Sequence, residues 1–258
     1  MRTVVRVSQR VEETPSTVTL RFPFAPEAEP GQFVMLWIPG EDELPMSLSY
    51  TEGPSKGVTV KAMGNTSRRI LSVRPGDPVG VRGPYGHGID LSPRQVLLVA
   101  GGSGAAVLAP AAERAARHGS RLTVALGATT RAELLFAERF RTMGAEVVVA
   151  TDDGSAGERG FVTGPAARLL QERSFDAVWT CGPEVMMVKV AERARAQRVR
   201  TFCSVERHMK CALGMCDACA LGPYHVCTDG PVFPADRLTV LPEFGRTKRD
   251  SSGRRVPL

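Results

Sequence analysis

The sequence lacks any long hydrophobic run. No apolar stretch reaches the roughly 18 residues that a membrane-spanning helix needs. The N-terminal residues MRTVVRVSQR do not show the basic-then-apolar pattern of a secretory signal. Internal repeats and low-complexity tracts are absent as well. We therefore expect a cytoplasmic protein that does not contact a membrane.

Clustered positive charge is also scarce. The chain has a formal net charge of +6, but its Lys and Arg residues are interleaved with acidic residues. Surfaces that bind nucleic acid gather their basic residues on one face, so this distribution argues against a nucleic-acid partner. The one dense basic run, residues 246–255, is typical of a solvated chain end.

The constellations that hydrolases use are missing. No Ser-His-Asp arrangement and no pair of carboxylates stands out, and the four histidines show no metal-ligand spacing. Redox chemistry carried by bound cofactors is therefore the better prediction.

Cysteine is rare except in one stretch, residues 210–227, KCALGMCDACALGPYHVC, which holds four of the six cysteines. In a reducing compartment such a group is better explained by metal ligands than by disulfides. The spacing C-x4-C-x2-C is typical of a plant-type [2Fe–2S] site, and Gly214 lies in the loop whose amides can hydrogen bond the sulfurs. Zinc is the alternative, although zinc ribbons usually carry two C-x2-C pairs and only one is present. The predicted ligands are Cys211, Cys216, Cys219 and Cys227.

Residues 1–92 have the composition of short β-strands. Segments rich in Val, Ile, Thr and Phe, such as TVTLRF and QFVMLWI, alternate with turns rich in Pro and Gly. Six or so strands at this spacing predict a small antiparallel barrel. One short helix is expected at residues 67–74, with Thr66 or Ser67 capping its first turn. Residues 44–50 and 63–69 are polar interruptions that suit either plain turns or the binding of a diphosphate.

Residues 93–202 alternate between strand and helix patterns, which predicts a doubly wound parallel sheet with helices on both faces. A ligand of such a sheet binds at the carboxyl ends of the strands. The periodicity ends near residue 203, so the segment 203–258 needs a metal or cluster to fold around. The whole chain is therefore predicted to be a multidomain β plus α/β protein. Strands are expected at 95–100, 121–128, 145–151, 177–181 and 200–205, and helices from 104, at 131–143, 163–173 and 183–197.

Two motifs follow strands of the predicted sheet. In GGSGAAVLAP, the glycines Gly101, Gly102 and Gly104 would let the backbone approach a pyrophosphate at a helix N-terminus, although a plain tight turn is the alternative. In TCGPEVMM, Cys181 ends a strand where the reactive ring of a cofactor would lie, and the alternative is a small buried residue.

Taken in this order, the motifs resemble the ferredoxin–NADP reductase superfamily, most closely its branch of class B dihydroorotate dehydrogenase electron-transfer subunits. LPMSLSY is similar to the flavin motif of that superfamily, and GNTSRRI with PGDPVGVRGPYGHGID is similar to its second flavin stretch. VAGGSGAAVLAP and TCGPEVMM resemble its pyridine-nucleotide turn and its Cys-Gly-Pro motif. SVERHMKCALGMCDACALGPYHVCTDGPVF resembles the cluster-binding ending of the branch, so the resemblance covers nearly the whole chain.

This resemblance implies an electron relay with FAD, NAD(H) and a [2Fe–2S] cluster. Electrons would pass from the FMN of a dihydroorotate dehydrogenase catalytic subunit through the cluster and FAD to NAD+, within a heterotetramer that serves pyrimidine (UMP) synthesis. Cys181 would lie near the hydride-transfer region as the catalytic residue. The implied nucleotide residues are Gly101, Gly102, Gly104, Gly182 and Pro183, and the implied flavin residues are Pro45, Met46, Ser47, Leu48, Val60, Lys61, Thr66 and Ser67.

Two residues depart from the pattern of the family. Leu44 stands where most members have an arginine that neutralises the FAD pyrophosphate, and Lys61 or Arg68 would have to supply that charge. Ala212 replaces a glycine of the cluster loop, which would strain the loop if the position needs a positive φ.

Other functions fit the same motifs. The main alternative is a diaphorase-type subunit of a hydrogenase, a sulfite reductase or a ferredoxin–NADP oxidoreductase, which differs only in its partner. A scaffold protein with a zinc-stabilised tail and no redox function is a further alternative, favoured by Leu44 alone. A relay subunit should expose its cluster end to a partner, so an apolar face is expected near residues 231–238; the alternative is that this segment packs on the nucleotide domain of the same chain.

Overall fold

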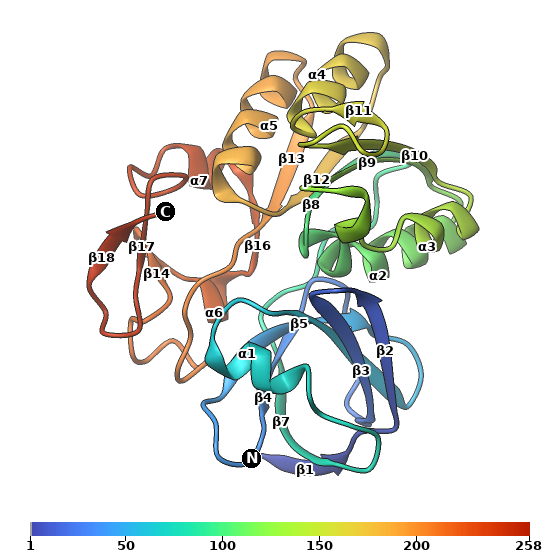
Figure 1. Ribbon diagram of the computed structural model, residues 1–258. Coiled ribbons are helices and arrows are strands. Elements are labelled where there is room, and N and C mark those ends of the chain that lie inside the picture. The colour runs from blue at the N-terminus through green and yellow to red at the C-terminus, as the bar shows by residue number, and fades with distance from the viewer. Residues whose placement is uncertain (1) are drawn as a thin grey trace.

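The structure is a computed structural model that describes residues 2–258. Residue 1, with which the predicted barrel begins, lies outside the described residues. Figure 1 shows a curved β unit in the lower half, an α/β unit in the upper half, and the C-terminal segment, in red, beside both. Among residues 2–258, no helix is both long enough and apolar enough to cross a bilayer. The predicted combination of an antiparallel β unit and a doubly wound α/β unit is confirmed.

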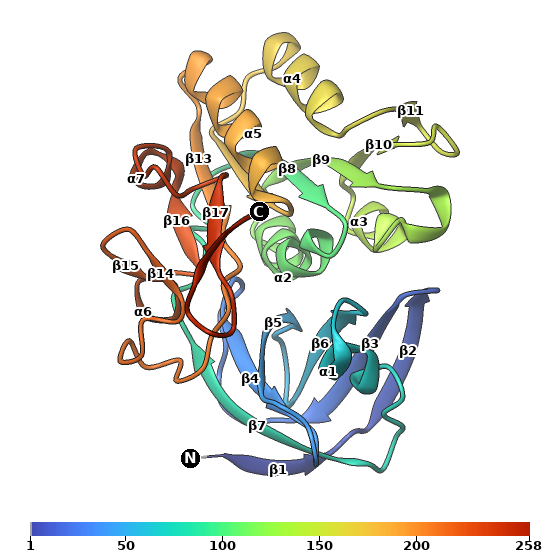
Figure 2. The same cartoon turned by 60° about the vertical axis from the view of Figure 1, so that its left-hand side comes forward.

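The N-terminal unit is one antiparallel sheet of seven strands in the order β1-β7-β4-β5-β6-β3-β2. Figure 2 shows this sheet curled into a half-barrel, with β1 and β2 at its two edges. Its concave side is filled by apolar side chains such as Leu20, Phe22 and Val58, all at 0 % exposure. The strands are β1 (Thr3–Arg6), β2 (Gln9–Thr14), β3 (Thr17–Pro23), β4 (Phe33–Trp37), β5 (Leu44–Tyr50), β6 (Ser55–Lys61) and β7 (Pro78–Tyr85).

Two strands of the half-barrel differ from the prediction. Residues 44–50, expected to be a polar interruption, form β5, because they pair with β4 on one side and β6 on the other. The sequence of β2, QRVEET, is polar and was not recognised as a separate strand. An edge strand with one solvated face needs few apolar residues, which explains why composition did not reveal it.

The short helix α1 (Asn65–Ile70) begins earlier than predicted. Its N-cap is Gly64, so neither Thr66 nor Ser67 occupies the cap position, and that expectation is wrong. Ser67 instead acts from the third helical position, where its Oγ accepts the backbone N–H groups of Met63 and Gly64 at 2.9 and 2.8 Å. A side chain at this position can satisfy the free donors of a helix start as well as an N-cap residue does.

The upper unit is a seven-stranded sheet in the order β11-β10-β9-β8-β12-β13-β16. All neighbouring pairs are parallel except β13 with β16. Two separate apolar clusters, one on each face of β8, show that helices cover both faces, as predicted. The strands are β8 (Gln95–Gly101), β9 (Arg121–Ala128), β10 (Glu146–Thr151), β11 (Glu158–Arg159), β12 (Ala177–Cys181) and β13 (Arg200–Ser204). The helices are α2 (Gly104–Arg117), η1 (Arg131–Glu133), α3 (Ala137–Thr142), α4 (Thr163–Glu172) and α5 (Glu184–Ala196).

The helix expected at 131–143 is split into η1 and α3. The break lies at Leu135 and Phe136, which are 3 % and 9 % exposed in the core beside α2 and α3. Phe136 adopts a φ of 63°, which no helix can continue through. Burial of these two side chains therefore overrides the helical propensity of the stretch.

The C-terminal segment completes the upper unit. Its strand β16 adds to the edge of β13, with Cys203 opposite Phe233. Apolar residues of this segment, such as Val226 and Leu238, share one core cluster with β8, α5 and the barrel residue Phe33. The boundaries predicted near residues 92 and 202 stay predictions. The remaining elements are β14 (Ala220–Leu221), β15 (Tyr224–His225), α6 (Val226–Asp229), β16 (Val232–Pro234), α7 (Ala235–Thr239), β17 (Thr247–Arg249) and β18 (Arg255–Pro257).

The apolar face expected at residues 231–238 is not exposed. Phe233 and Leu238 are 1 % and 0 % exposed, because β16 pairs with β13 and α7 packs beside it. This segment covers the protein's own sheet, and the prediction of an open docking face there is wrong.

Candidate redox site

The four predicted cluster ligands lie in the irregular connection between β13 and β16. None of them is in a disulfide. Cys219 and Cys227 are buried, at 2 % and 1 % exposure, whereas Cys216 is exposed and Cys211 lies between these extremes. A site with one buried and one exposed half can hold a cluster firmly and still present it to a partner.

Backbone amides of the loop point at the sulfurs. Leu213 and Met215 donate their N–H groups to Cys211 Sγ over 3.3 and 3.4 Å, and Gly214 donates to Cys227 Sγ over 3.3 Å. Amide donors of this kind stabilise thiolates and tune the potential of a cluster that the thiolates bind. The loop therefore supplies hydrogen bonds that would orient and stabilise the sulfur ligands of an iron–sulfur cluster.

The cysteine side chains affect one another: Cys216 hydrogen bonds Cys211, and both Cys227 and Cys216 act on Cys219. Although burial opposes it, hydrogen bonds from the loop amides and from Cys216 lower the pKa of Cys211 to about 6. Burial and the adjoining thiol of Cys227 raise the pKa of Cys219 to about 12. The loop thus already stabilises the Cys211 thiolate, the form of cysteine that binds iron, whereas the buried Cys219 would ionise on binding a positively charged metal. Within residues 2–258, no three Cys, His, Asp or Glu side chains form one group for a single metal ion.

Left-handed backbone shapes the loop. Ala212 has a φ of 58°, so the position does require the positive φ that its replacement of glycine had put in question. Asp217 has a φ of 53° and Gly214 a φ of 71°. A β-carbon at Gly214 would lie 3.2 Å from Thr228 Oγ1, a tight contact that adds to the conformational need for glycine there.

The two predicted nucleotide motifs meet at the carboxyl ends of β8 and β12. These strands are parallel neighbours, with Ala100 opposite Cys181. A β-carbon at Gly101 would come within 2.8 Å of Met186 Sδ, and one at Gly104 would collide with the carbonyl oxygen of Cys181. Gly102 takes a φ of 54° at the turn. The glycines therefore let α2 begin directly against the Cys-Gly-Pro turn, which brings Gly182 and Pro183 to the same place.

Cys181 itself is 0 % exposed. Burial, together with the nearby Glu206 carboxylate, raises the pKa of its thiol well above the ordinary value. The side chain is thus a neutral thiol at physiological pH, and it is not suited to act as a nucleophile.

The predicted flavin residues lie on β5, β6 and α1. Pro45, Met46 and Ser47 are half-buried on β5, whereas the side chains of Leu48 and Val60 are buried in the half-barrel core at 0 % and 1 % exposure. The structure therefore places these last two away from any open surface.

The polar flavin candidates already have protein partners. Lys61 Nζ forms an ion pair with Glu133 of η1 over 2.9 Å, so its charge is neutralised from the upper unit. Thr66 Oγ1 lies 3.4 Å from Glu41, and Ser67 is used at the start of α1. Arg68, on the same helix, is exposed. Of the two cations considered as substitutes for the missing arginine at Leu44, Arg68 is the one whose charge is not already paired by Glu133.

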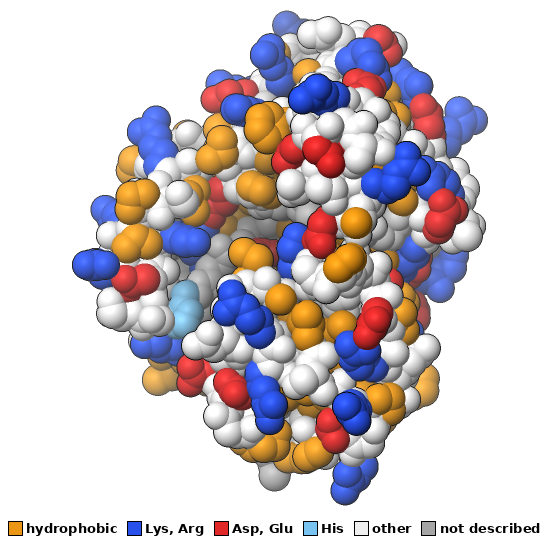
Figure 3. All heavy atoms as spheres, viewed as in Figure 1, with side chains coloured by type: hydrophobic (Ala, Val, Ile, Leu, Met, Phe, Trp, Pro, Cys, Tyr) orange, Lys and Arg blue, Asp and Glu red, His pale blue; other side chains and the backbone are white. Residues whose placement is uncertain are grey.

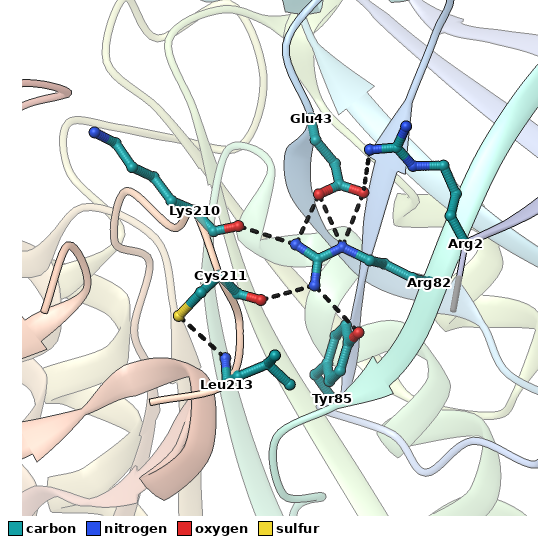
Figure 4. A network of polar contacts seen from close by, with 7 residues as sticks. All are labelled: Arg2, Glu43, Arg82, Tyr85, Lys210, Cys211 and Leu213. Carbon is teal, nitrogen blue, oxygen red and sulfur yellow. Dashed lines mark hydrogen bonds and ion pairs between the residues drawn. The ribbon is translucent and has the colours of Figure 1, made fainter. Parts of the chain in front are cut away.

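The sequence did not reveal a polar network that joins the half-barrel to the cluster loop (Figure 4). Arg82 on β7 donates to the carbonyl oxygens of Lys210 and Cys211, and Glu43 holds its guanidinium from the other side. Arg82 is separated from Lys210 and Cys211 by more than a hundred positions in the chain, so no spacing or motif could have indicated the contact.

A second buried link joins the start of α5 to the chain entering the cluster loop. The Arg207 and Glu184 side chains are 1 % and 6 % exposed and form an ion pair, with Nη2 and Oε2 3.1 Å apart. Glu184 also accepts the backbone N–H of Gly245 over 3.0 Å. Glu184 directly follows the Cys-Gly-Pro turn, so this pair fixes the nucleotide motif to the cluster segment. Figure 3 shows the molecule hollowed between its upper and lower halves beside the C-terminal segment.

Comparison with known proteins gives three findings. The family model described as the iron-sulfur cluster binding domain of dihydroorotate dehydrogenase B matches residues 206–239. A protein of Methanocaldococcus jannaschii, named probable dihydroorotate dehydrogenase B (NAD(+)), electron transfer subunit, is 40 % identical over 98 % of this chain and 97 % of its own length. A protein of Thermoplasma volcanium with the same name is 42 % identical and covers 98 % of both chains.

Solved structures agree with the fold. The structure described for an NADH-dependent reduced ferredoxin-NADP oxidoreductase, in work on flavin-based electron bifurcation, has a TM-score of 0.82 and 30 % identity over 92 % of this chain and 91 % of that one. The FAD/NAD binding domain of nitric oxide dioxygenase from Vibrio cholerae has a TM-score of 0.63 over 76 % of this chain and 93 % of that one, and at 19 % identity it shows the fold alone.

Proposed function

Because the chain belongs to the family of dihydroorotate dehydrogenase B (NAD(+)) electron transfer subunits, we propose that it relays electrons between NAD(H) and a catalytic partner protein. FAD binds at the half-barrel, NAD(H) at the carboxyl ends of β8 and β12, and a [2Fe–2S] cluster at the four cysteines. When bound, FAD exchanges a hydride with NAD(H), and the cluster carries electrons one at a time.

The observation that carries this proposal is the convergence of the three sites. Cys181 at the nucleotide site lies opposite Ser204 of β13, from which the chain runs directly into the cluster loop. Glu43, which precedes the flavin strand β5, reaches the same loop through Arg82. Cofactors held at these three places would surround one hollow (Figure 3). They would then lie close to one another, as electron transfer between them requires.

The residues of this chain supply binding and orientation. The glycine turn leaves room for a pyrophosphate at the start of α2, where the helix dipole favours negative charge. Cys181 remains neutral and packs at the strand end, so it fills space beside the reacting ring and takes no proton. The amides of Leu213, Gly214 and Met215 hold the thiolates that the cluster needs.

Arg68 supplies the positive charge that Leu44 does not offer to the FAD pyrophosphate. Its position on α1 beside Thr66 and Ser67, and its exposure, support this role. The Arg68→Ala protein should lose FAD on desalting, whereas Lys61→Ala, whose charge is already paired with Glu133, should retain it. Equal retention by both variants would contradict the assignment.

The partner is the FMN-containing dihydroorotate dehydrogenase catalytic subunit, in a heterotetramer that operates in the cytoplasm for pyrimidine synthesis. The names of the relatives, which call them electron transfer subunits, support an assembly with a catalytic protein. On this chain, Leu213 and Met215 at the tip of the cluster loop are 57 % and 80 % exposed. Apolar residues exposed beside a redox site suit a docking surface.

A subunit of a ferredoxin–NADP oxidoreductase remains a second candidate, because the structure with a TM-score of 0.82 is described as that kind of enzyme. Hydrogenase and sulfite reductase subunits of the same architecture differ from it only in the partner. Reduction of NAD+ by dihydroorotate, on mixing this chain with a dihydroorotate dehydrogenase catalytic subunit, would favour the first candidate. Reduction of ferredoxin in its place would favour the second.

The cofactor content tests the relay itself. An anaerobic preparation should contain two irons, two acid-labile sulfides and one FAD per chain, and it should be yellow-brown. The Cys227→Ser protein should lose the cluster but keep FAD, since Cys227 is a ligand in the cluster loop and is not part of β5, β6 or α1, where the flavin residues lie. A colourless protein that contains zinc would overturn the proposal in favour of a structural tail.

A further inference from the structure

Arg82 occupies a place between two cofactor sites. It lies on β7, opposite Met35 of β4, and Met35 is in turn opposite Pro45 of the flavin strand β5. From there its Nη1 donates to the carbonyl oxygen of Cys211 over 2.7 Å, and its Nη2 donates to that of Lys210 over 2.9 Å. Figure 4 shows the guanidinium reaching from the half-barrel to the backbone of the cluster loop.

The guanidinium is held in this position by other contacts. Its Nε lies 2.9 and 2.8 Å from the two carboxylate oxygens of Glu43, and Nη2 lies 2.7 Å from Oε2. The Arg82 and Glu43 side chains are only 16 % and 13 % exposed. The hydroxyl of Tyr85 lies 3.2 Å from Nη1, and the guanidinium also lies over the Tyr85 ring. A planar guanidinium that is hydrogen bonded by Glu43, Tyr85 and two backbone carbonyls has little freedom to move.

We infer that Arg82 is a positioning residue for electron transfer: it fixes the first cluster ligand relative to the flavin strand and keeps a positive charge beside the cluster. This inference rests on the proposed [2Fe–2S] cluster and deepens its description. The chain of contacts runs from Glu43, next to Leu44 at the start of β5, through Arg82 to Cys211. One end of this chain thus lies next to the flavin strand and the other at a cluster ligand.

The charge has a defined effect. Reduction adds one electron to the cluster and transfers no atom, so the reduced form carries one more negative charge than the oxidised form. A fixed cation nearby favours the reduced form, and a fixed anion disfavours it. Arg82 and Glu43 therefore shift the cluster potential in opposite directions, with the larger effect from Arg82 because it touches the ligand residue directly.

If the pair of Arg82 and Glu43 only supported the loop structurally, the variants would behave differently. Loss of either partner would then loosen the loop in the same way, and the two substitutions would change the cluster in the same direction. Opposite shifts identify the electrostatic role, because disorder alone cannot produce them. Lysine distinguishes charge from geometry, since it keeps the charge but lacks the planar set of five donors with which Arg82 reaches both carbonyls, Glu43 and Tyr85.

The experiment compares full-length proteins prepared anaerobically with FAD and cluster. Arg82→Gln, Arg82→Lys and Glu43→Gln are titrated with dithionite, and the cluster midpoint potential is followed by electron paramagnetic resonance. The rate at which the cluster bleaches after NADH is mixed in by stopped flow gives the second readout. Arg2→Gln is the matched control, because Arg2 also contacts Glu43, over 3.3 Å, without touching the cluster loop.

We expect Arg82→Gln to weaken the relative stability of the reduced cluster about tenfold, a 59 mV fall in midpoint potential for a one-electron couple. Glu43→Gln should raise the midpoint potential. Arg82→Lys should have a potential close to that of the parent, because the charge is kept, while cluster bleaching stays slow. Arg2→Gln should change neither the potential nor the bleaching rate. Potentials equal to the parent in Arg82→Gln and Glu43→Gln, or shifted in the same direction in both, would overturn the inference. If Arg82→Gln takes up no cluster, Glu43→Gln and Arg82→Lys decide by the same criteria. A parent protein without iron and sulfide would instead refute the proposed function.

Discussion

The parallel sheet and the cluster loop are neighbours in space, yet different forces hold them. Every residue of β8 from Val96 to Ala100 is 0 % exposed, and the strand is fixed by burial of apolar side chains between two layers of helices. The loop from residue 205 to residue 231 has no regular ladder of its own beyond a two-residue hairpin. The loop buries apolar side chains such as Val226 as well, but its irregular backbone also depends on Arg82 and on the ion pair of Arg207 with Glu184, and its amides point at sulfur.

This difference determines how substitutions destabilise each region. Apolar burial is spread over many contacts, so a sheet loses stability in proportion to the atoms removed. A loop that also needs a few polar links depends on individual partners, because a buried charge or a thiolate without its partner is costly. Substitutions in the two regions should therefore differ in kind as well as in size.

The largest difference is expected in the reactivity of thiols. Burial raises the pKa of Cys203 in β13 to about 12. Only the thiolate reacts, and a raised pKa lowers the fraction of Cys203 that is thiolate at every pH below that pKa. At pH 8, Cys203 should therefore alkylate about a thousandfold more slowly than an ordinary thiol. Its alkylation rate should rise about tenfold with each pH unit. After a chelator removes the cluster, iodoacetamide labelling followed by mass spectrometry should modify the exposed Cys216 and the low-pKa Cys211 and leave Cys203 unlabelled. Labelling of Cys203 at the same rate as Cys216 would show that the sheet is not tightly closed.

The second effect concerns the buried ion pair. Arg207→Met should lower the free energy of unfolding by about 3–5 kcal/mol, because Glu184 would remain buried without its cation. Urea denaturation followed by circular dichroism measures the loss. The double variant Arg207→Met with Glu184→Leu is the control, and it should recover most of the stability, apart from the unpaired N–H of Gly245. A double variant no more stable than the single one would contradict the charge argument.

The third prediction concerns the sheet. Leu98→Ala should cost about 2–5 kcal/mol, since the side chain is 0 % exposed in the core on the α2 face. The matched change Leu98→Met keeps most of the volume and should cost less than about 1.5 kcal/mol. Both proteins should keep the cluster spectrum of the parent. A cluster spectrum altered by Leu98→Met would mean that the two regions are not as separate as their contacts indicate.

The smallest effect is expected at Ala212. Glycine there would relieve about 1–2 kcal/mol of left-handed strain. It would also lose a buried methyl group, about 0.8 kcal/mol, and would gain freedom in the unfolded chain, about 0.4–1 kcal/mol. These contributions nearly cancel, so the urea midpoint should move by less than the equivalent of about 1 kcal/mol. Ala218→Gly, in the same loop without a positive φ, is the control and should only destabilise.

The same contrast explains what the sequence could predict. Buried strands and amphipathic helices have their own periodicity, so β8, β9, β12 and the helices around them were recognisable. The cysteine spacing indicated the cluster loop, because ligand geometry limits how the residues are arranged. Which cofactor atoms Cys181, Lys61 or Ser47 would touch stays a prediction.

Long-range partners could not be predicted. Nothing around Arg82 or Glu43 distinguishes them from other surface charges until the chain brings residues 43, 82 and 211 together. Pro45 and Ser47 made β5 look like a turn, since its strand character comes from pairing with β4 and β6 and not from its composition. The break at Phe136 likewise depends on a core formed by other parts of the chain.

The position of β16 also affects the order of assembly. All four cysteines lie in the connection between β13 and β16, and β16 is the strand that covers the open edge of β13. During synthesis the nucleotide sheet therefore keeps an unpaired edge until every cluster ligand has been made. Closing that edge draws the ligand loop against the sheet and the half-barrel, so maturation of the metal site and completion of the sheet belong to one late stage in the life of the nascent chain.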